Sequence, residues 1–160
     1  FKLHAQNGYY NGTTFHRVIP GFMIQGGDPL TKSDDRSRHG TGGNAAKYFG
    51  IGTESDESTW DLPAEFSPTP HERGILSMAR SQNPDSGGSQ FFVCVDNVPQ
   101  LDNNYTVFGE VISGLEVIDK IVNSSTPGTQ NPSYRGPDRD NPLEAVKMNI
   151  SLISASELDL

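Results

Sequence analysis

The stretch FHRVIPGFMIQGGD, residues 15–28, carries the clearest fold signal in this chain. Two short runs rich in β-branched, aromatic and other apolar residues, 13–19 and 22–25, flank Pro20 and Gly21. Proline and glycine favour a turn, and runs of this composition favour strands. The stretch therefore predicts a strand, a tight turn and a second strand.

Side chains along a strand alternate between the two faces of its sheet, so sequence neighbours are separated. Met23 and Gln25 are therefore expected to share one face. His16 and Arg17 are expected to point to opposite faces, so that only one of them can serve a given pocket. Periodicity does not decide whether a large apolar side chain such as Met23 belongs to the core or to a pocket.

The rest of the chain carries further strand and helix patterns. Strands are predicted over 74–79, 90–95 and 106–111, and alternating apolar and polar residues predict a half-buried final strand over 146–152. Residues 113–116, SGLE, have the spacing of a helix capping box and lead into apolar residues at helical spacing. This pattern predicts a short amphipathic helix.

The composition favours one loop-rich domain with a modest core. The 160 residues include 17 Gly and 11 Pro, which set turns and interrupt helices. Two long polar stretches, 28–65 and 124–141, are expected to be surface excursions. Because no repeat or linker interrupts the pattern, we predict a single domain over residues 1–154 and a short tail, 155–160.

The charge balance and the single cysteine narrow the function classes. Twelve Lys and Arg against 20 Asp and Glu give a formal net charge of −8, which disfavours binding to nucleic acid or to anionic membranes. Cys94 alone allows no internal disulfide and no cysteine-rich zinc site, and we expect no metal or cofactor. It favours a reducing compartment, so a cytoplasmic location is expected, with export as the alternative.

Signatures of hydrolytic enzymes are weak. Residues 87–91, GGSQF, lack the second glycine of a nucleophile elbow, so Ser89 is expected to serve the turn before a strand. The four histidines show no i, i+4 pairing of the metalloprotease type. What remains is a site of aromatic, thioether, amide and guanidinium groups without a nucleophile.

Two segments carry a family resemblance. Residues 15–28 resemble the signature of the cyclophilin family of peptidyl-prolyl cis/trans isomerases, and 74–79 together with 88–93 resemble its second signature. Weaker matches lie at 40–43 and 101–111, and the likeness runs from Phe1 to about Ile153. The resemblance implies a mainly β fold, an eight-stranded antiparallel β-barrel with flanking helices and a groove on its outer face. On this alignment the chain starts within the first helix, so the first two strands of the barrel are expected to be missing.

The resemblance also implies an activity and a site. The expected enzyme accelerates rotation about X-Pro bonds in proline-containing peptides and unfolded proteins, assists folding and needs no cofactor. Arg17 matches the family's catalytic residue. The positions that match its substrate-binding residues are Phe22, Met23, Gln25, Gly40, Ala79, Arg80, Gln90, Phe92, Leu101 and Tyr105. A proline-recognising binding module with little or no turnover is the alternative.

Three positions depart from the family pattern. Gln100 stands where many members have a tryptophan that strengthens binding of cyclosporin, so weakened cyclosporin affinity is expected. Tyr105 stands where a histidine is frequent, and Arg80 replaces a common asparagine. Arg80 places a positive charge at the groove, so we expect an altered preference for the residues around proline.

Overall fold

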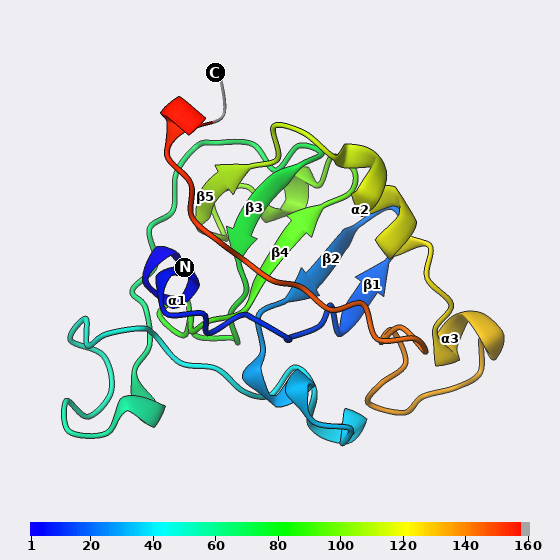
Figure 1. Cartoon of the computed structure of the whole chain (residues 1–160), viewed down its shortest axis with the longest axis horizontal. Helices are drawn as coiled ribbons and strands as arrows, with labels where there is room; N and C mark the ends of the chain where they lie inside the picture. Colours follow the sequence, from blue (N-terminus) through cyan, green and yellow to red (C-terminus); the bar gives the residue numbers. More distant parts are fainter. Residues whose placement is uncertain (158–160) are drawn as a thin grey trace.

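A five-stranded antiparallel sheet forms the centre of the computed structural model, which describes residues 1–157 (Figure 1). The strands lie side by side in the order β1-β2-β4-β3-β5. Their bounds are Arg17–Ile19 for β1, Met23–Gly26 for β2, Ile75–Met78 for β3, Phe91–Cys94 for β4 and Val107–Glu110 for β5. The prediction of strand, turn and strand around Pro20 and Gly21 is confirmed, although β1 is shorter than the run 13–19.

The register of the sheet aligns one row of residues across four strands. Arg17 of β1 lies opposite Gln25 of β2, Gln25 lies opposite Phe92 of β4, and Phe92 lies opposite Ser77 of β3. Directly opposed residues share a face of the sheet. The row therefore brings together, on one face of the sheet, side chains that are distant in sequence. Arg17 and Phe92, for example, are 75 positions apart.

The two faces of the sheet carry two separate apolar clusters. One cluster contains Ile24, Phe91 and Val93, and the other contains Met23 and Phe92, so neighbours along β2 and β4 are divided between the faces. This alternation confirms the expectation that Met23 and Gln25 share a face. It also means that the second cluster is available to line a surface site.

The helices of the described chain are short. The α-helices are α1 (Lys2–Gln6), α2 (Leu115–Val122) and α3 (Pro127–Gln130). Helix α2 packs against β1 and β2 and buries Ile118 and Val122, as its spacing predicts. The predicted capping box is wrong, because Gly114 with a φ of 84° is the N-cap and no side chain caps the helix. The helix begins too late for Ser113 to take that position.

The predicted final strand over 146–152 is also wrong. This segment forms a single bridge, between Thr14 and Lys147, although Met148 N donates to Thr13 O at 2.8 Å. Met148 is buried with Ile24 in the first cluster while Lys147 is exposed, so the alternation reports burial. The backbone bonds to residues 12–15 involve only residues 146 and 148 and do not extend into a strand. In Figure 1 the segment, coloured orange to red, passes across the face of the sheet instead of along an edge.

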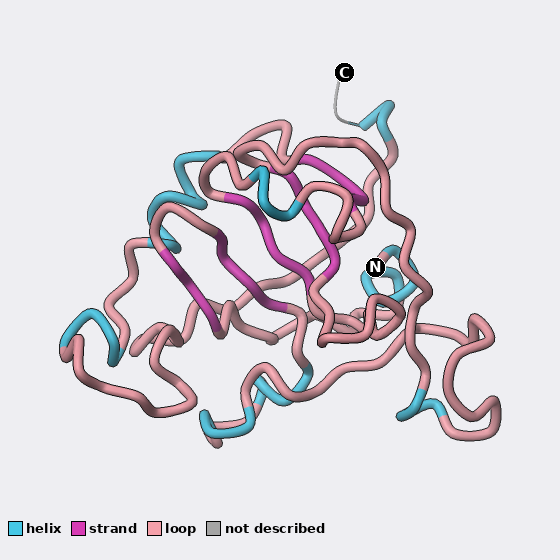
Figure 2. Tube along the Cα trace, turned by 180° about the vertical axis from the view of Figure 1, so that it is seen from behind, coloured by secondary structure: helices cyan, strands magenta, loops and turns pink. Residues whose placement is uncertain are grey.

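Loops make up most of the chain outside the sheet, as seen from behind in Figure 2. The excursion that follows β2 contains three 3-10 turns, η1 (Pro29–Lys32), η2 (Arg36–Arg38) and η3 (Glu57–Thr59). A fourth, η4 (Pro99–Leu101), follows β4, and η5 (Ala155–Glu157) lies in the predicted tail, whose residues 158–160 are outside the described part of the chain. Within residues 1–157, no helix has the length and apolar character that a bilayer span requires.

Asp28 fixes the start of this excursion. Its fully buried carboxylate accepts hydrogen bonds from Leu30 N at 2.8 Å, from Gly42 N at 3.2 Å and from Gly40 N. A buried polar group requires a hydrogen-bond partner. The carboxylate of Asp28 and these three backbone N–H groups satisfy one another without water. The glycine-rich residues 40–43 are consequently held beside the sheet.

Candidate active site

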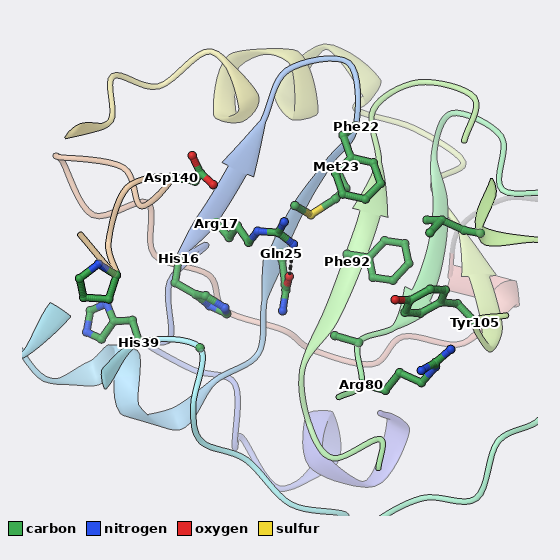
Figure 3. A pocket seen from close by; sticks show the side chains of 14 residues that line it. His16, Arg17, Phe22, Met23, Gln25, His39, Arg80, Phe92, Tyr105 and Asp140 are labelled. Carbon is green, nitrogen blue, oxygen red and sulfur yellow. Dashed lines mark hydrogen bonds between the residues drawn. The ribbon is translucent and has the colours of Figure 1, made fainter. Parts of the chain in front are cut away.

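A groove of about 360 Å³ lies on the face of the sheet that carries the second apolar cluster (Figure 3). All the residues that the resemblance assigned to the site line this groove except Gln90. They are Arg17, Phe22, Met23, Gln25, Gly40, Ala79, Arg80, Phe92, Leu101 and Tyr105. Residues from five separate stretches of sequence thus meet in one hollow.

The middle of the groove is apolar. Met23, Phe92 and Leu101 are buried, and their exposed fractions are 1%, 5% and 8%. Phe92 meets the half-buried Tyr105 edge to face, with ring centroids 5.7 Å apart, which is a favourable arrangement for aromatic pairs. These side chains form a preformed floor and wall for a small aliphatic ring.

Arg17 supplies a cation beside this floor. It is the first residue of β1, and its exposed guanidinium lies 5.9 Å from the centroid of the Phe22 ring. Nη1 donates to Oε1 of Gln25 at 3.3 Å. None of the ion pairs found among residues 1–157 includes Arg17. The guanidinium therefore has donors left for a ligand.

Amide side chains link Arg17 to the glycine-rich loop. Gln25 Nε2 donates to Oε1 of Gln90 at 3.0 Å. Gln90 Nε2 in turn donates to the carbonyl oxygens of Gly40 at 3.0 Å and Gly42 at 2.8 Å. Gln90 lies in a side hollow of about 290 Å³ that shares Gln25 and Gly40 with the groove. Gln90 therefore lies beside the groove and contacts it through its hydrogen bond to Gln25.

His16 lines the groove together with Arg17, so the expectation that only one of them could do so is wrong. His16 precedes β1, and strict alternation does not apply to it. Its side chain is buried, and neither ring nitrogen has a hydrogen-bond partner. Burial lowers the pKa of His16 to about 4, an effect that the nearby Asp28 carboxylate partly opposes. The ring is therefore neutral at physiological pH.

Three further groove residues were missed by the sequence reading: His39, Pro137 and Asp140. They belong to the two stretches interpreted as surface excursions. Asp140 O accepts from Val18 N of β1 at 2.8 Å, which brings the second excursion alongside the sheet. The sequence offers no periodicity that could have placed them, because long-range bonds that join the two excursions to each other and to the sheet decide their position.

Arg36 ties the two excursions together at this end of the groove. Its guanidinium donates to Asp138 Oδ2 at 3.0 Å, to Asn141 O at 2.9 Å and to Pro142 O at 2.8 Å. His39 meets Asn141 nearby, with Nδ1 and Nδ2 3.0 Å apart. A guanidinium that bonds three acceptors on one segment holds that segment in a defined position.

A buried hydrogen-bond chain stands behind Phe92. His71 Nδ1 lies 3.0 Å from Asp102 Oδ1, and His71 Nε2 lies 3.0 Å from Ser77 Oγ. Ser77 and His71 are buried, and Ser77 Oγ donates to Thr106 O at 2.9 Å. Because no substrate can reach this hydroxyl, the chain supports the pocket wall and does not act as a hydrolytic triad.

Comparison with known proteins identifies the family. A family model described as cyclophilin type peptidyl-prolyl cis-trans isomerase/CLD matches residues 1–148. A probable peptidyl-prolyl cis-trans isomerase of Brucella abortus is 45% identical over 142 residues, which cover 86% of this chain and 65% of that protein. Peptidyl-prolyl cis-trans isomerase 9 of Schizosaccharomyces pombe is 38% identical over 157 residues, 96% of this chain and 21% of that protein. The chain therefore spans only part of the length of these relatives.

Solved structures agree with this result. A crystal structure of a cyclophilin type peptidyl-prolyl cis-trans isomerase of Cryptosporidium parvum has a TM-score of 0.72 and 29% identity, over 96% of this chain and 82% of that one. The same protein crystallised in the presence of the dipeptide Ala-Pro has a TM-score of 0.69. By sequence and by fold, this chain belongs to the cyclophilin family of peptidyl-prolyl cis-trans isomerases.

Proposed function

We propose that this chain is a peptidyl-prolyl cis-trans isomerase that acts on X-Pro bonds of flexible or unfolded chains and thereby assists folding. The observation that carries the proposal is the guanidinium of Arg17, which stands beside a preformed apolar floor with donors free. The Cryptosporidium relative crystallised in the presence of Ala-Pro supports a proline-containing peptide as the ligand.

The chemistry needs no nucleophile. An X-Pro bond rotates slowly because amide resonance opposes the twist, with a barrier of ~18–20 kcal/mol. In the twisted transition state the nitrogen lone pair is no longer delocalised into the carbonyl. A donor placed near that nitrogen stabilises the twisted state more than either planar state, and only such a difference accelerates the reaction.

The residues of the groove fit these requirements. In the proposed complex the pyrrolidine ring lies against Phe92, Met23 and Leu101, which exclude water from it. Arg17 donates to the twisting amide, and a guanidinium keeps its charge across the physiological pH range. Gln25 orients that guanidinium through its hydrogen bond at 3.3 Å. No covalent bond is formed or broken.

The test compares turnover with binding. Arg17→Ala is expected to lower kcat/KM about 10²- to 10³-fold, the usual loss for one donor that acts on the transition state. Peptide affinity, measured by calorimetry, is expected to change only a few-fold. Arg135→Ala is the matched control, since it removes an equal charge from an exposed arginine that does not line the groove.

Two results would change the proposal. The activity is measured by protease-free NMR exchange on a proline peptide. If Arg17→Ala isomerises this peptide at the normal rate, Arg17 has no part in the mechanism. A wild-type chain that binds the peptide without accelerating its isomerisation would be a proline-recognising module.

The groove is also proposed to bind cyclosporin, with weakened affinity. Gln100 is exposed on η4, next to the buried Leu101 of the groove. An amide at this position supplies less apolar surface than an indole would. We therefore expect cyclosporin to make fewer apolar contacts on the Leu101 side of the groove.

A further inference from the structure

We propose that Arg80 makes this groove select prolines that have an aspartate or glutamate close by in the substrate. The inference rests on the proposed isomerase activity and adds a substrate class to it. Arg80 follows β3 and lines the groove, and it also lines the side hollow and a third hollow of about 350 Å³. A peptide that leaves the groove on this side must pass the Arg80 side chain.

The guanidinium of Arg80 is held in one position before any ligand arrives. Nε and Nη2 donate to Asn104 O at 3.1 and 2.9 Å, and Nη1 donates to Ser81 O at 2.9 Å. Its Cζ lies 4.6 Å from the ring centroid of Tyr105 and 5.9 Å from that of Phe66. A side chain that is ordered in advance loses little further entropy when it binds an anion.

Arg80 forms no ion pair with another residue in the described part of the chain, although Glu65 lines the third hollow with it. The hydrogen-bond acceptors of its guanidinium are neutral backbone carbonyls. Among the described residues that line the groove, Asp140 alone carries a carboxylate, and Arg139 pairs with it at 2.9 Å. The groove therefore keeps an excess of positive charge in a chain whose formal net charge is −8.

The positive charge lies within reach of the residues that flank a bound proline. Tyr105 stands between Phe92 and Arg80, with its ring centroid 5.7 Å from that of Phe92 and 4.6 Å from Arg80 Cζ. Figure 3 shows Tyr105 and Arg80 together on one side of the groove, with Asp140 on the opposite side. An extended peptide advances ~3.3 Å per residue. A carboxylate within about three residues of the proline can therefore meet Arg80.

The experiment uses matched peptides in protease-free NMR exchange. Each set places Glu, Gln or Lys at one of the positions within three residues of a single proline, and the readout is the ratio of kcat/KM for Glu to that for Gln. At one or more positions we expect a ratio of about three to five in the wild-type chain, the value of a partly exposed charge pair. The Lys peptide is expected to be slower than the Gln peptide at the same position.

Two variants assign the effect to Arg80. In Arg80→Gln the ratio is expected to fall to about one, and in Arg135→Gln it should stay at the wild-type value, because the exposed Arg135 does not line the groove. The Arg80→Gln substitution also removes the hydrogen bonds that hold the loop at Asn104. A second test therefore leaves the chain unchanged: the wild-type ratio is measured again in about 0.5 M salt, where screening should reduce it.

The outcomes separate this inference from the proposed function. No turnover of any peptide would overturn the isomerase proposal itself. Turnover with equal rates for Glu and Gln at every position, or a ratio that survives in Arg80→Gln or at high salt, would overturn the selectivity while the isomerase proposal stands.

Discussion

The side-chain amide of Gln25 donates a hydrogen bond from Nε2 to Oε1 of Gln90 at 3.0 Å, between the second strand and the residue that precedes the fourth. Because Gln25 also accepts from Arg17 and Gln90 donates to Gly40 and Gly42, the cation of the groove is linked through two amides to the glycine-rich loop. The orientation of Arg17 is thus a property of three segments that are distant in sequence.

Removal of the Gln25 side-chain amide should change the orientation of Arg17 without disturbing the fold. Gln25→Leu keeps a similar volume but loses both hydrogen bonds, and we expect kcat to fall roughly tenfold because the donor is no longer aligned. The thermal midpoint should change by only a few degrees, since Gln25 is half-buried. Gln130→Leu, on the exposed end of α3, is the control. An unchanged kcat in Gln25→Leu would mean that Arg17 needs no such support.

Asp28 should contribute strongly to stability. Asp28→Asn removes one carboxylate oxygen from a buried site that accepts three backbone N–H groups, and we expect the free energy of unfolding to fall by about 2 kcal/mol. Urea titration measures this loss, and amide exchange should quicken at Gly40 and Gly42. Asp35→Asn is a control on an exposed N-cap in the same excursion. Equal urea midpoints for the two variants would contradict the role given to Asp28.

Stability should decline in mild acid because of His16. Its pKa is lowered from 6.5 to about 4 by burial, so between these values the unfolded chain binds a proton that the folded chain does not. The free energy of unfolding should therefore fall as pH drops from about 6.5 toward 4, by at most about 3 kcal/mol from this residue. The pKa of His4 is also lowered by burial, which acts in the same direction. Urea titrations between pH 7 and 4.5 measure the slope, and His16→Gln should flatten it; an equal slope in that variant would refute the assignment.

Cyclosporin affinity should respond to Gln100. Gln100→Trp adds an aromatic surface next to Leu101, and we expect the Kd measured by calorimetry to tighten about three- to tenfold, because an aromatic contact contributes ~0.5–1.5 kcal/mol beyond its buried area. Gln130→Trp, on the exposed end of α3, controls for the added aromatic group. Equal affinities for the wild type and Gln100→Trp would show that this position does not limit the inhibitor.

Local sequence was enough to predict the hairpin and the face that Met23 and Gln25 share, whereas the groove residues were predicted from the family resemblance. Pro20 and Gly21 set the turn, and alternation along the second strand then places Met23 and Gln25 on one face. The same rule separates Phe92 from its neighbours on the fourth strand. These relations depend on backbone geometry within a few residues, which propensity and pattern capture directly.

Contacts between distant segments decided the rest. The alternation over 146–152 predicted a strand, yet this segment crosses the sheet and pairs with residues 12–15 at a single bridge, while Met148 is still buried. His39 and Asp140 reach the groove through bonds made by Arg36 and Val18, which join excursions without periodicity of their own. Such placements depend on which backbone and side-chain groups meet after the chain has folded, and no local pattern records them. The residues of the hairpin therefore predict its turn and the face that Met23 and Gln25 share, whereas only the folded chain shows how Arg17 is oriented and which residues close the groove around it.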